Sequence, residues 1–183
     1  FEVPFFEKYG LRADFVGHPV IERAANISGG DALRARLGIA ADAPLLALCP
    51  GSRTNEIRFI LPLFHQTVTL LAQRIPRLVT VLPTVPHVAA KVRAATGNWP
   101  TPLSVVEGEA DKFAAFHAAN AALAASGTVT AELALSHTPM VVGYKVGGLT
   151  FFLSKFLMTV THITLINILL GREAVPEFLQ AKA

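Results

Sequence analysis

The chain has 183 residues, enough for one well-buried domain or for one large lobe of a two-lobed enzyme. Hydrophobic residues make up 52% and charged residues 16%, which excludes an intrinsically disordered chain. The net charge of +3 comes from scattered basic residues, so charge alone does not distinguish nucleic acid, a membrane surface and phosphate ligands as partners. The single cysteine, Cys49, excludes an internal disulfide and favours a reducing compartment.

The first residues carry no signal-peptide pattern, because Glu2, Pro4 and Glu7 interrupt any apolar run. The chain opens at Phe1 in mid-pattern and without a starting Met. We therefore expect it to be a fragment of a longer protein.

Short apolar runs alternate with helix-like segments along the chain. The expected strands are Ala13–Gly17, Leu45–Cys49, Leu78–Leu82, Leu103–Val106, Ala121–Ala125 and Met140–Tyr144. The expected helices are Asp31–Leu37, Glu56–Arg74 (starting near or kinked at Pro62), Val88–Ala95, Ala110–Ala119 and Thr130–Ser136. Continuous apolar runs are typical of parallel strands covered on both faces. The fold class predicted is α/β, with a doubly wound parallel sheet that binds ligands beyond the carboxyl ends of its strands.

The segment Leu149–Leu170 is long enough to span a bilayer, but Lys155 lies near its middle. A central lysine costs roughly 2.5–3.5 kcal/mol on insertion. We expect a buried helix followed by a strand, with an interfacial helix and a membrane span as alternatives.

The first candidate site follows the strand Leu45–Cys49 as Pro50-Gly51-Ser52-Arg53. Gly51 allows a close backbone approach, Ser52 can donate a hydrogen bond, and the fork of Arg53, oriented by Glu56, suits phosphate oxygens. A plain strand-to-helix turn with a solvated arginine is the alternative.

The second candidate follows the strand Ala121–Ala125 as Ser126-Gly127-Thr128 and enters the helix that contains Glu132. Free N–H groups at a helix start bind phosphate, and a carboxylate one turn later can accept both hydroxyls of a ribose. The alternative is structural, with Thr128 as the N-cap and Glu132 as an acid favoured by the helix dipole.

Several other kinds of site are not indicated. No G-x-G-x-x-G follows a strand, and no G-x-x-x-x-G-K-[ST] occurs. The histidines and the lone cysteine show no metal-ligand spacing, so we expect no metal and no cofactor.

A third polar segment runs from Asn167 through Gly171, Arg172 and Glu173 to Gln180. Its spacing predicts a loop, and Pro176 followed by Glu177 is a helix-start signal.

Taken in order, these motifs resemble the lipid-A-disaccharide synthase family. The matching segments are Phe15–Pro19, Pro50–Arg53 with Glu56, Ala125–Thr128 with Glu132, Pro139–Tyr144 and Asn167–Gln180. Each motif is weak, whereas the ordered set is specific. The resemblance runs along the whole chain but covers only the C-terminal half of the family's usual length. One departure is Ile166, where the family pattern has proline before the asparagine.

The resemblance implies a metal-independent, inverting glycosyltransferase of the two-lobed GT-B type. It would join UDP-2,3-diacylglucosamine to 2,3-diacylglucosamine 1-phosphate, giving lipid A disaccharide 1-phosphate and UDP. Residues 1–183 would form the Rossmann-like C-terminal lobe that holds the UDP-sugar, and the N-terminal lobe, with the acceptor site and the general base, would be absent.

Carried over to this sequence, the resemblance makes Gly51, Ser52 and Arg53 UDP-binding residues, with Arg53 at the diphosphate. Ser126, Gly127 and Thr128 would meet the phosphates, and Glu132 the ribose. Arg53 and Asn167 would be the catalytic residues present, and no residue of this chain is named as the base. The fragment alone would be inactive.

The implied partners are a UDP-sugar lipid donor, a phosphorylated glycolipid acceptor and the cytoplasmic face of the inner membrane, with no nucleic acid. Phe151, Phe152, Phe156 and Leu157 beside Lys155 could contribute to a membrane-facing surface. The full-length family members can form homodimers. Two alternatives remain open: another UDP-sugar enzyme, such as an epimerase or a transferase for soluble acceptors, and a non-catalytic membrane-surface module.

Overall fold

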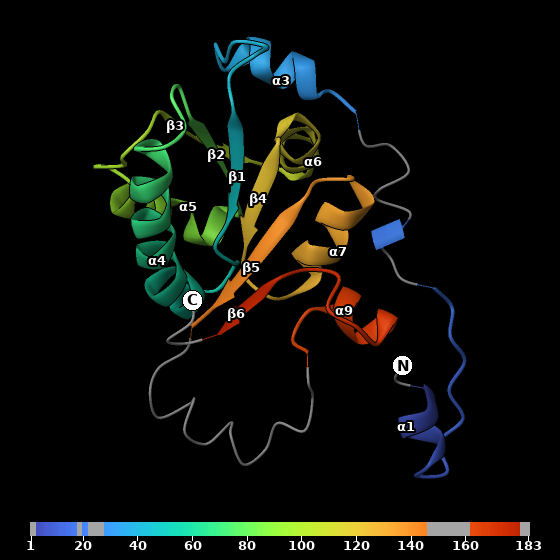
Figure 1. Ribbon diagram of the computed structural model, residues 1–183. Coiled ribbons are helices and arrows are strands. Elements are labelled where there is room, and N and C mark those ends of the chain that lie inside the picture. The colour runs from blue at the N-terminus through green and yellow to red at the C-terminus, as the bar shows by residue number, and fades with distance from the viewer. Residues whose placement is uncertain (1–2, 18–19, 22–27, 146–161, 180–183) are drawn as a thin grey trace.

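The computed structural model describes residues 3–17, 20–21, 28–145 and 162–179, which form a parallel α/β sheet with helices on both faces (Figure 1). The strands are β1 (Leu45–Cys49), β2 (Val79–Thr84), β3 (Leu103–Glu107), β4 (Ala121–Ala124), β5 (Met140–Tyr144) and β6 (Glu177–Leu179). Their order in the sheet is β3-β2-β1-β4-β5-β6, and every neighbouring pair is parallel. The predicted doubly wound sheet is therefore confirmed.

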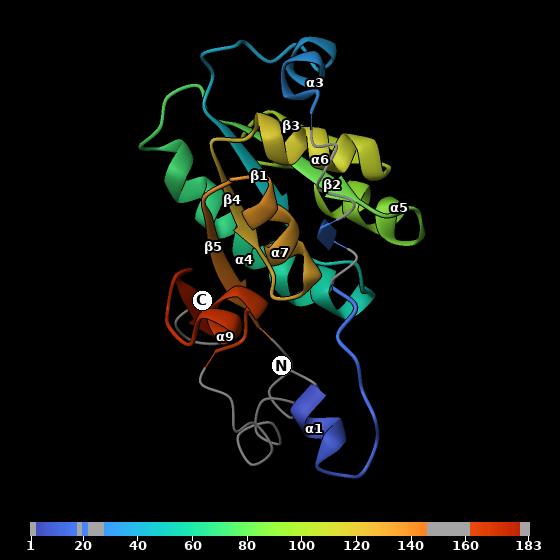
Figure 2. The ribbon, with the colours of Figure 1, turned by 90° about the vertical axis from the view of Figure 1, so that its right-hand side faces the viewer.

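Both faces of the sheet are covered, which explains why its central strands are apolar throughout. In β1, Leu45, Ala47 and Cys49 belong to one hydrophobic core, whereas Leu46 and Leu48 belong to the other. The first core is closed by α3 (Gly30–Arg36), α6 (Glu109–Ala118) and α7 (Thr128–Leu135), and the second by α4 (Thr54–Ala72) and α5 (Pro86–Ala95). Figure 2 shows α6 and α7 in front of the sheet and α4 behind it.

The order of the strands reverses at the centre of the sheet. From β1 the chain winds outward through α4, β2 and α5 to β3, and then α6 returns it to β4 on the other side of β1. The switch point of this sheet therefore lies between the carboxyl ends of β1 and β4. In open α/β sheets ligands bind in the crevice at such a point.

The four helices predicted between β1 and β5 are confirmed, with their ends shifted by a few residues. Helix α4 runs through Pro62 without ending there. Two short helices were not predicted as such, α1 (Val3–Glu7) and α9 (Leu165–Leu170).

The predicted strand Ala13–Gly17 is wrong. These residues form no strand and are exposed, with Phe15 at 76% and Val16 at 94% of full exposure. The apolar pattern is that of a strand, but a strand exists only where a neighbouring edge accepts its backbone hydrogen bonds, and none of the described strands pairs with it.

The helix start expected at Pro176-Glu177 is also wrong, because Glu177–Leu179 is strand β6. The Pro176 carbonyl accepts a hydrogen bond from Val142 N at 2.9 Å, and the strand continues that pairing along β5. The open edge of β5 therefore outweighs the local helix signal.

Much of the segment Leu149–Leu170 lies outside the described residues. Its described end is helix α9 instead of the expected strand, because the Thr164 side chain caps that helix by accepting a hydrogen bond from Asn167 N. Across the ranges that the structure describes, no helix is long and apolar enough to cross a bilayer.

A buried arginine fastens α3 to the end of the sheet opposite the switch point. Arg34 donates hydrogen bonds to the carbonyl oxygens of Ala40 and Ala43 at 3.0 Å and of Ala118 at 2.7 and 3.2 Å. It also reaches Asn120 Oδ1, which accepts from Leu45 N at the start of β1. One guanidinium thus joins α3, the end of α6 and the first residue of β1.

We predict that Arg34→Met lowers the free energy of unfolding by about 2–4 kcal/mol, because several buried carbonyls lose a charged donor. Denaturant titration measures this loss. The matched control is Arg36→Met on the same helix, whose guanidinium is exposed and pairs with Asp111 at the surface. If both variants lose the same stability, the network around Arg34 contributes nothing specific.

Candidate functional site

The two loops predicted to bind phosphate lie side by side at the switch point. Residues 50–53 follow β1 and residues 125–128 follow β4. The two strands are paired up to their ends, with Cys49 opposite Ala124 and Ala125 N donating to the Cys49 carbonyl at 2.8 Å. The topology therefore brings together two motifs that are more than 70 residues apart in the sequence.

The first loop is shaped by a glycine and a glutamate. Gly51 has φ +108°, and a Cβ at this position would collide with the side chain of Glu56. Glu56 Oε2 accepts from Ser52 N at 2.9 Å and from Arg53 N at 3.1 Å, and its Oε1 accepts from Arg53 Nη1 at 2.8 Å. The expected orientation of Arg53 by Glu56 is thus present, while the arginine side chain stays 81% exposed.

Side chains from α5 hold the outer side of this loop, and sequence reasoning missed them. His87 Nε2 donates to the Ser52 carbonyl at 2.8 Å, and Lys91 Nζ donates to Thr54 Oγ1 at 3.3 Å. Both follow β2, whose carboxyl end lies beside that of β1. Only the order of the strands places them there.

The second loop leads into α7 through Gly127, which is the N-cap with φ +143°. The alternative in which Thr128 caps the helix is therefore wrong. Among the described residues no side chain caps α7. Thr130 N donates to the Gly127 carbonyl at 3.2 Å, so the N–H groups of Thr128 and Val129 are the ones left for an anion. Thr128 is exposed beside them, whereas Ser126 Oγ donates to the Ile163 carbonyl at 2.7 Å.

Glu132 is almost buried, with 8% of its side chain exposed, and it forms an ion pair that the sequence did not reveal. Its Oε1 accepts from Lys112 Nζ on α6 at 2.7 Å. Burial raises the pKa of the Cys49 thiol to about 12, and the charge of Glu132 adds to this rise while Lys112 opposes it. The thiol is therefore neutral.

Asn167 is fully buried and its amide is fully engaged. Nδ2 donates to the Val175 carbonyl at 2.8 Å and to Glu177 Oε1 at 2.7 Å, while Oδ1 accepts from Ala174 N and Val175 N. The structure uses this amide to hold the segment 171–177, and it forms no hydrogen bond with either of the two loops. Its assignment as a catalytic residue stays a prediction.

Glu177 joins this segment to the second loop. Its carboxylate accepts from Ile163 N, Thr164 N, Thr164 Oγ1 and Asn167 Nδ2 at 2.7–3.0 Å. Because Ile163 also accepts from Ser126, a continuous chain of hydrogen bonds runs from β6 to the phosphate loop. Burial acts to raise the pKa of Glu177, but the hydrogen bonds from Thr164, Ile163 and Asn167 outweigh it and hold the pKa below its ordinary value.

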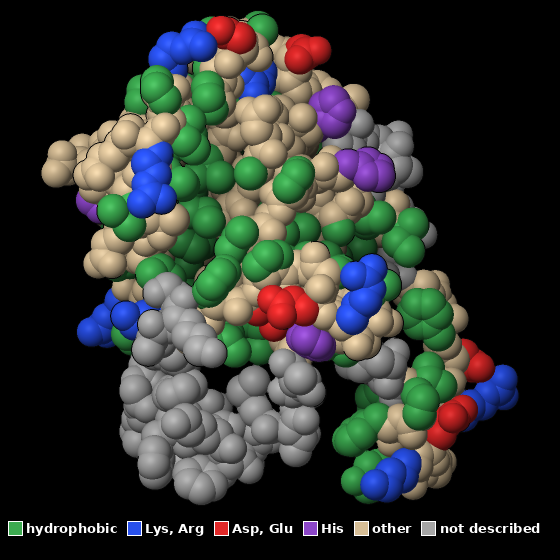
Figure 3. All heavy atoms as spheres, in the orientation of Figure 1, with side chains coloured by type: hydrophobic (Ala, Val, Ile, Leu, Met, Phe, Trp, Pro, Cys, Tyr) green, Lys and Arg blue, Asp and Glu red, His purple; other side chains and the backbone are tan. Residues whose placement is uncertain are grey.

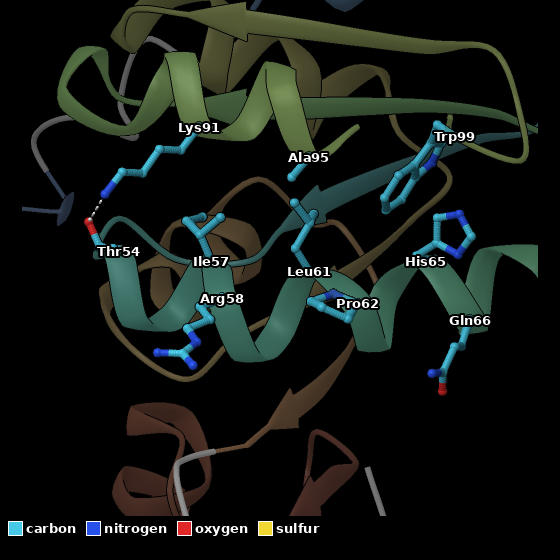
Figure 4. A pocket seen from close by; sticks show the side chains of 10 residues that line it. All are labelled: Thr54, Ile57, Arg58, Leu61, Pro62, His65, Gln66, Lys91, Ala95 and Trp99. Atoms are coloured by element: carbon cyan, nitrogen blue, oxygen red, sulfur yellow. Dashed lines mark hydrogen bonds between the residues drawn. The ribbon is translucent and has the colours of Figure 1, made fainter. Parts of the chain in front are cut away.

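A groove of about 500 Å³ lies between α4 and α5, away from the switch point (Figure 4). Its walls include Ile57, Leu61, Ala95 and Trp99, and at one end Thr54 and Lys91 lie next to the first loop. Because it holds neither Arg53 nor Glu132, we place the candidate site at the switch point.

Neither surface charge nor a cluster of metal ligands points to another site among the described residues. On the face seen in Figure 3, basic side chains are dispersed and do not form one patch. In the part of the chain that the structure describes, no cluster of three His, Cys, Asp or Glu side chains could hold a metal ion.

Comparison with known proteins gives a consistent match. The model of the family described as lipid-A-disaccharide synthetase matches residues 1–183. The chain is 47% identical to the lipid-A-disaccharide synthase of Rhodospirillum centenum, over 98% of this chain and 45% of that protein. It is 46% identical to the enzyme of the same name from Paramagnetospirillum magneticum, over 98% of this chain and 46% of that protein. The chain thus spans about half the length of the curated relatives it matches.

Solved structures resemble the chain in fold. WaaG, a glycosyltransferase involved in lipopolysaccharide biosynthesis, has a TM-score of 0.55 at 14% identity, over 91% of this chain and 42% of that one. A family 9 glycosyl transferase from Veillonella parvula has a TM-score of 0.53 at 16% identity, over 68% of this chain and 35% of that one.

The hydrogen bonds to Glu177 predict how stability depends on pH. A carboxyl whose pKa is lower in the folded state stabilises the fold above its unfolded pKa, about 4.3 for glutamate, and loses that contribution as the pH falls through the folded pKa. We therefore expect Glu177→Gln to be less stable than the parent chain at pH 7. The gap should narrow below about pH 4.3.

Thermal or denaturant unfolding of both proteins between pH 7 and pH 3 measures this gap. A gap that stays constant as the pH falls would mean that the folded chain does not favour the ionised carboxyl.

Proposed function

Because the chain belongs to the lipid-A-disaccharide synthetase family, we propose that it is the UDP-sugar-binding lobe of a glycosyltransferase of lipid A biosynthesis. The full reaction joins UDP-2,3-diacylglucosamine to 2,3-diacylglucosamine 1-phosphate and releases UDP. One observation carries this proposal. An exposed arginine follows β1, and an uncapped helix start with a nearly buried carboxylate follows β4, the two strands that flank the switch point of a sheet like those of glycosyltransferases.

Each part of this site suits one part of UDP. The free N–H groups at the start of α7 and the fork of Arg53 are donors for the diphosphate. Glu132 lies one turn into the same helix, where its carboxylate accepts hydrogen bonds from the ribose hydroxyls. Gly51 and Gly127 let the two loops approach the ligand closely.

The chemistry follows from where charge develops. When the sugar–phosphate bond breaks, negative charge grows on the departing UDP. Fixed donors stabilise that charge without reorganising, which is the role we assign to Arg53 and the α7 backbone. In this scheme no metal is needed at the diphosphate.

The rest of the enzyme is assigned to the part of its relatives that this chain does not match. Those proteins are about twice as long as the matched region, so we place the acceptor site and the general base in the other lobe. Since both substrates are lipids, the proposed place of action is the cytoplasmic face of the inner membrane. From its family, the full-length protein is also proposed to form a homodimer. The residues suggested for membrane contact, Phe151, Phe152, Phe156 and Leu157, lie outside the described residues.

We predict that the chain binds UDP in excess EDTA, as measured by calorimetry. Glu132→Ala should weaken UDP roughly 10- to 100-fold, the equivalent of about 1.5–3 kcal/mol, because a charge-assisted hydrogen bond to the ribose is lost. The affinity for inorganic diphosphate should change little. Strict dependence on added magnesium, or equal losses for both ligands, would contradict the assigned site.

We also predict that this chain alone makes no disaccharide from the two lipid substrates. Holding two reactants together lowers a barrier by roughly 7–11 kcal/mol, and a lobe that holds only the donor gains little of this. General-base catalysis, about 10²–10⁴-fold, is likewise assigned to the other lobe. A product assay beside a full-length relative provides the comparison, and turnover within about a hundredfold of that enzyme would place the base in this chain.

A further inference from the structure

We propose that Lys112 is a positioning residue of the UDP site, which acts through Glu132 by fixing which carboxylate oxygen faces the ribose. This inference rests on the proposed function. Lys112 lies on the crossover helix α6, whereas the loops of the site follow β1 and β4. Its Nζ donates to Glu132 Oε1 at 2.7 Å, with 25% of the lysine side chain and 8% of the glutamate side chain exposed.

A carboxylate as buried as that of Glu132 needs a charged partner. An isolated buried charge is strongly unfavourable, and removing one partner of a buried pair leaves the other uncompensated. Without Lys112, the Glu132 carboxylate loses the ion pair that holds it and turns toward solvent. This movement takes the acceptor away from the position that the ribose hydroxyls require.

The lysine is itself held in place by its neighbours on α6. Asp111 pairs with Arg36 of α3, and Phe113 is buried in the core beneath the sheet. The Lys112 ammonium lies 4.6 Å from the centre of the Phe113 ring, a favourable cation–π distance. The cation therefore reaches Glu132 from a fixed direction.

The ion pair makes the two carboxylate oxygens of Glu132 different from each other. Oε1 is taken by Lys112, whereas Oε2 forms no hydrogen bond with any described residue. The Glu132 side chain keeps 8% of its surface exposed. Oε2 is thus the oxygen left for the ribose, and Lys112 determines this orientation.

The test is calorimetry of the 183-residue chain with UDP and with inorganic diphosphate. Lys112→Met removes the charge while keeping much of the side-chain volume, and Lys112→Arg keeps the charge. We expect Lys112→Met to weaken UDP about 10- to 100-fold and to change diphosphate little, and Lys112→Arg to restore most of the UDP affinity. Lys8→Met is the matched control, because Lys8 is an exposed lysine that belongs to neither loop of the site.

A double-mutant cycle separates positioning from direct contact. If Lys112 acts through Glu132, adding Lys112→Met to Glu132→Gln costs no further UDP affinity, because the carboxylate is already gone. Additive losses, or equal losses of UDP and diphosphate, would overturn the inference and make Lys112 a general cation of the site. If Glu132→Gln loses UDP affinity while Lys112→Met does not, this inference fails and the proposed function stands. If the parent chain binds no UDP, both fail.

Discussion

The pairing of β1 with β4 is the constraint on which the rest of this structure depends. These strands are far apart in the sequence, and they become neighbours only because α6 carries the chain back across the sheet. Their residues are buried from both sides, so the register from Leu46–Ala121 to Cys49–Ala124 is strongly specified. That register brings the Gly51 loop and the Gly127 loop to the same edge. Any ligand site made from the two loops depends on this pairing first.

Hydrogen-bond networks on both sides then hold the loops. Glu56 folds the first loop from within, and His87 holds it from α5. The second loop has no side-chain cap among the described residues and is held instead through Ser126, Ile163 and Glu177. Both loops are thus held by internal hydrogen bonds while Arg53 and the start of α7 keep exposed donors. Such a preorganised set of donors is suited to an anionic ligand.

Much of this arrangement could be predicted from the sequence, for a physical reason. Strands buried on both faces are continuous apolar runs, so β1, β4 and β5 are visible without any knowledge of their neighbours. Gly51, Arg53 and Glu132 could be named because residues following such strands occupy a predictable edge. Local sequence patterns give the wrong secondary structure where strand pairing decides it, as in the unpaired segment Ala13–Gly17 and in β6.

Contacts between distant elements could not be predicted in the same way. From the sequence alone, Lys112 looks like a solvated lysine of α6, and His87 looks like an ordinary residue at the start of α5. Asn167 was placed in the site by family resemblance, yet its amide is used entirely by Val175, Ala174 and Glu177. Sequence patterns indicate which strand end a residue follows, but they do not indicate which side chain from another helix meets it.

The central claim is that UDP lies between the carboxyl ends of β1 and β4. A crystal structure of the chain with UDP tests it most directly. We predict that the diphosphate lies between Arg53 and the first N–H groups of α7, with a ribose hydroxyl in hydrogen-bond reach of Glu132 Oε2. UDP bound in the groove between α4 and α5, or at the switch point with its ribose turned away from Glu132, would contradict it.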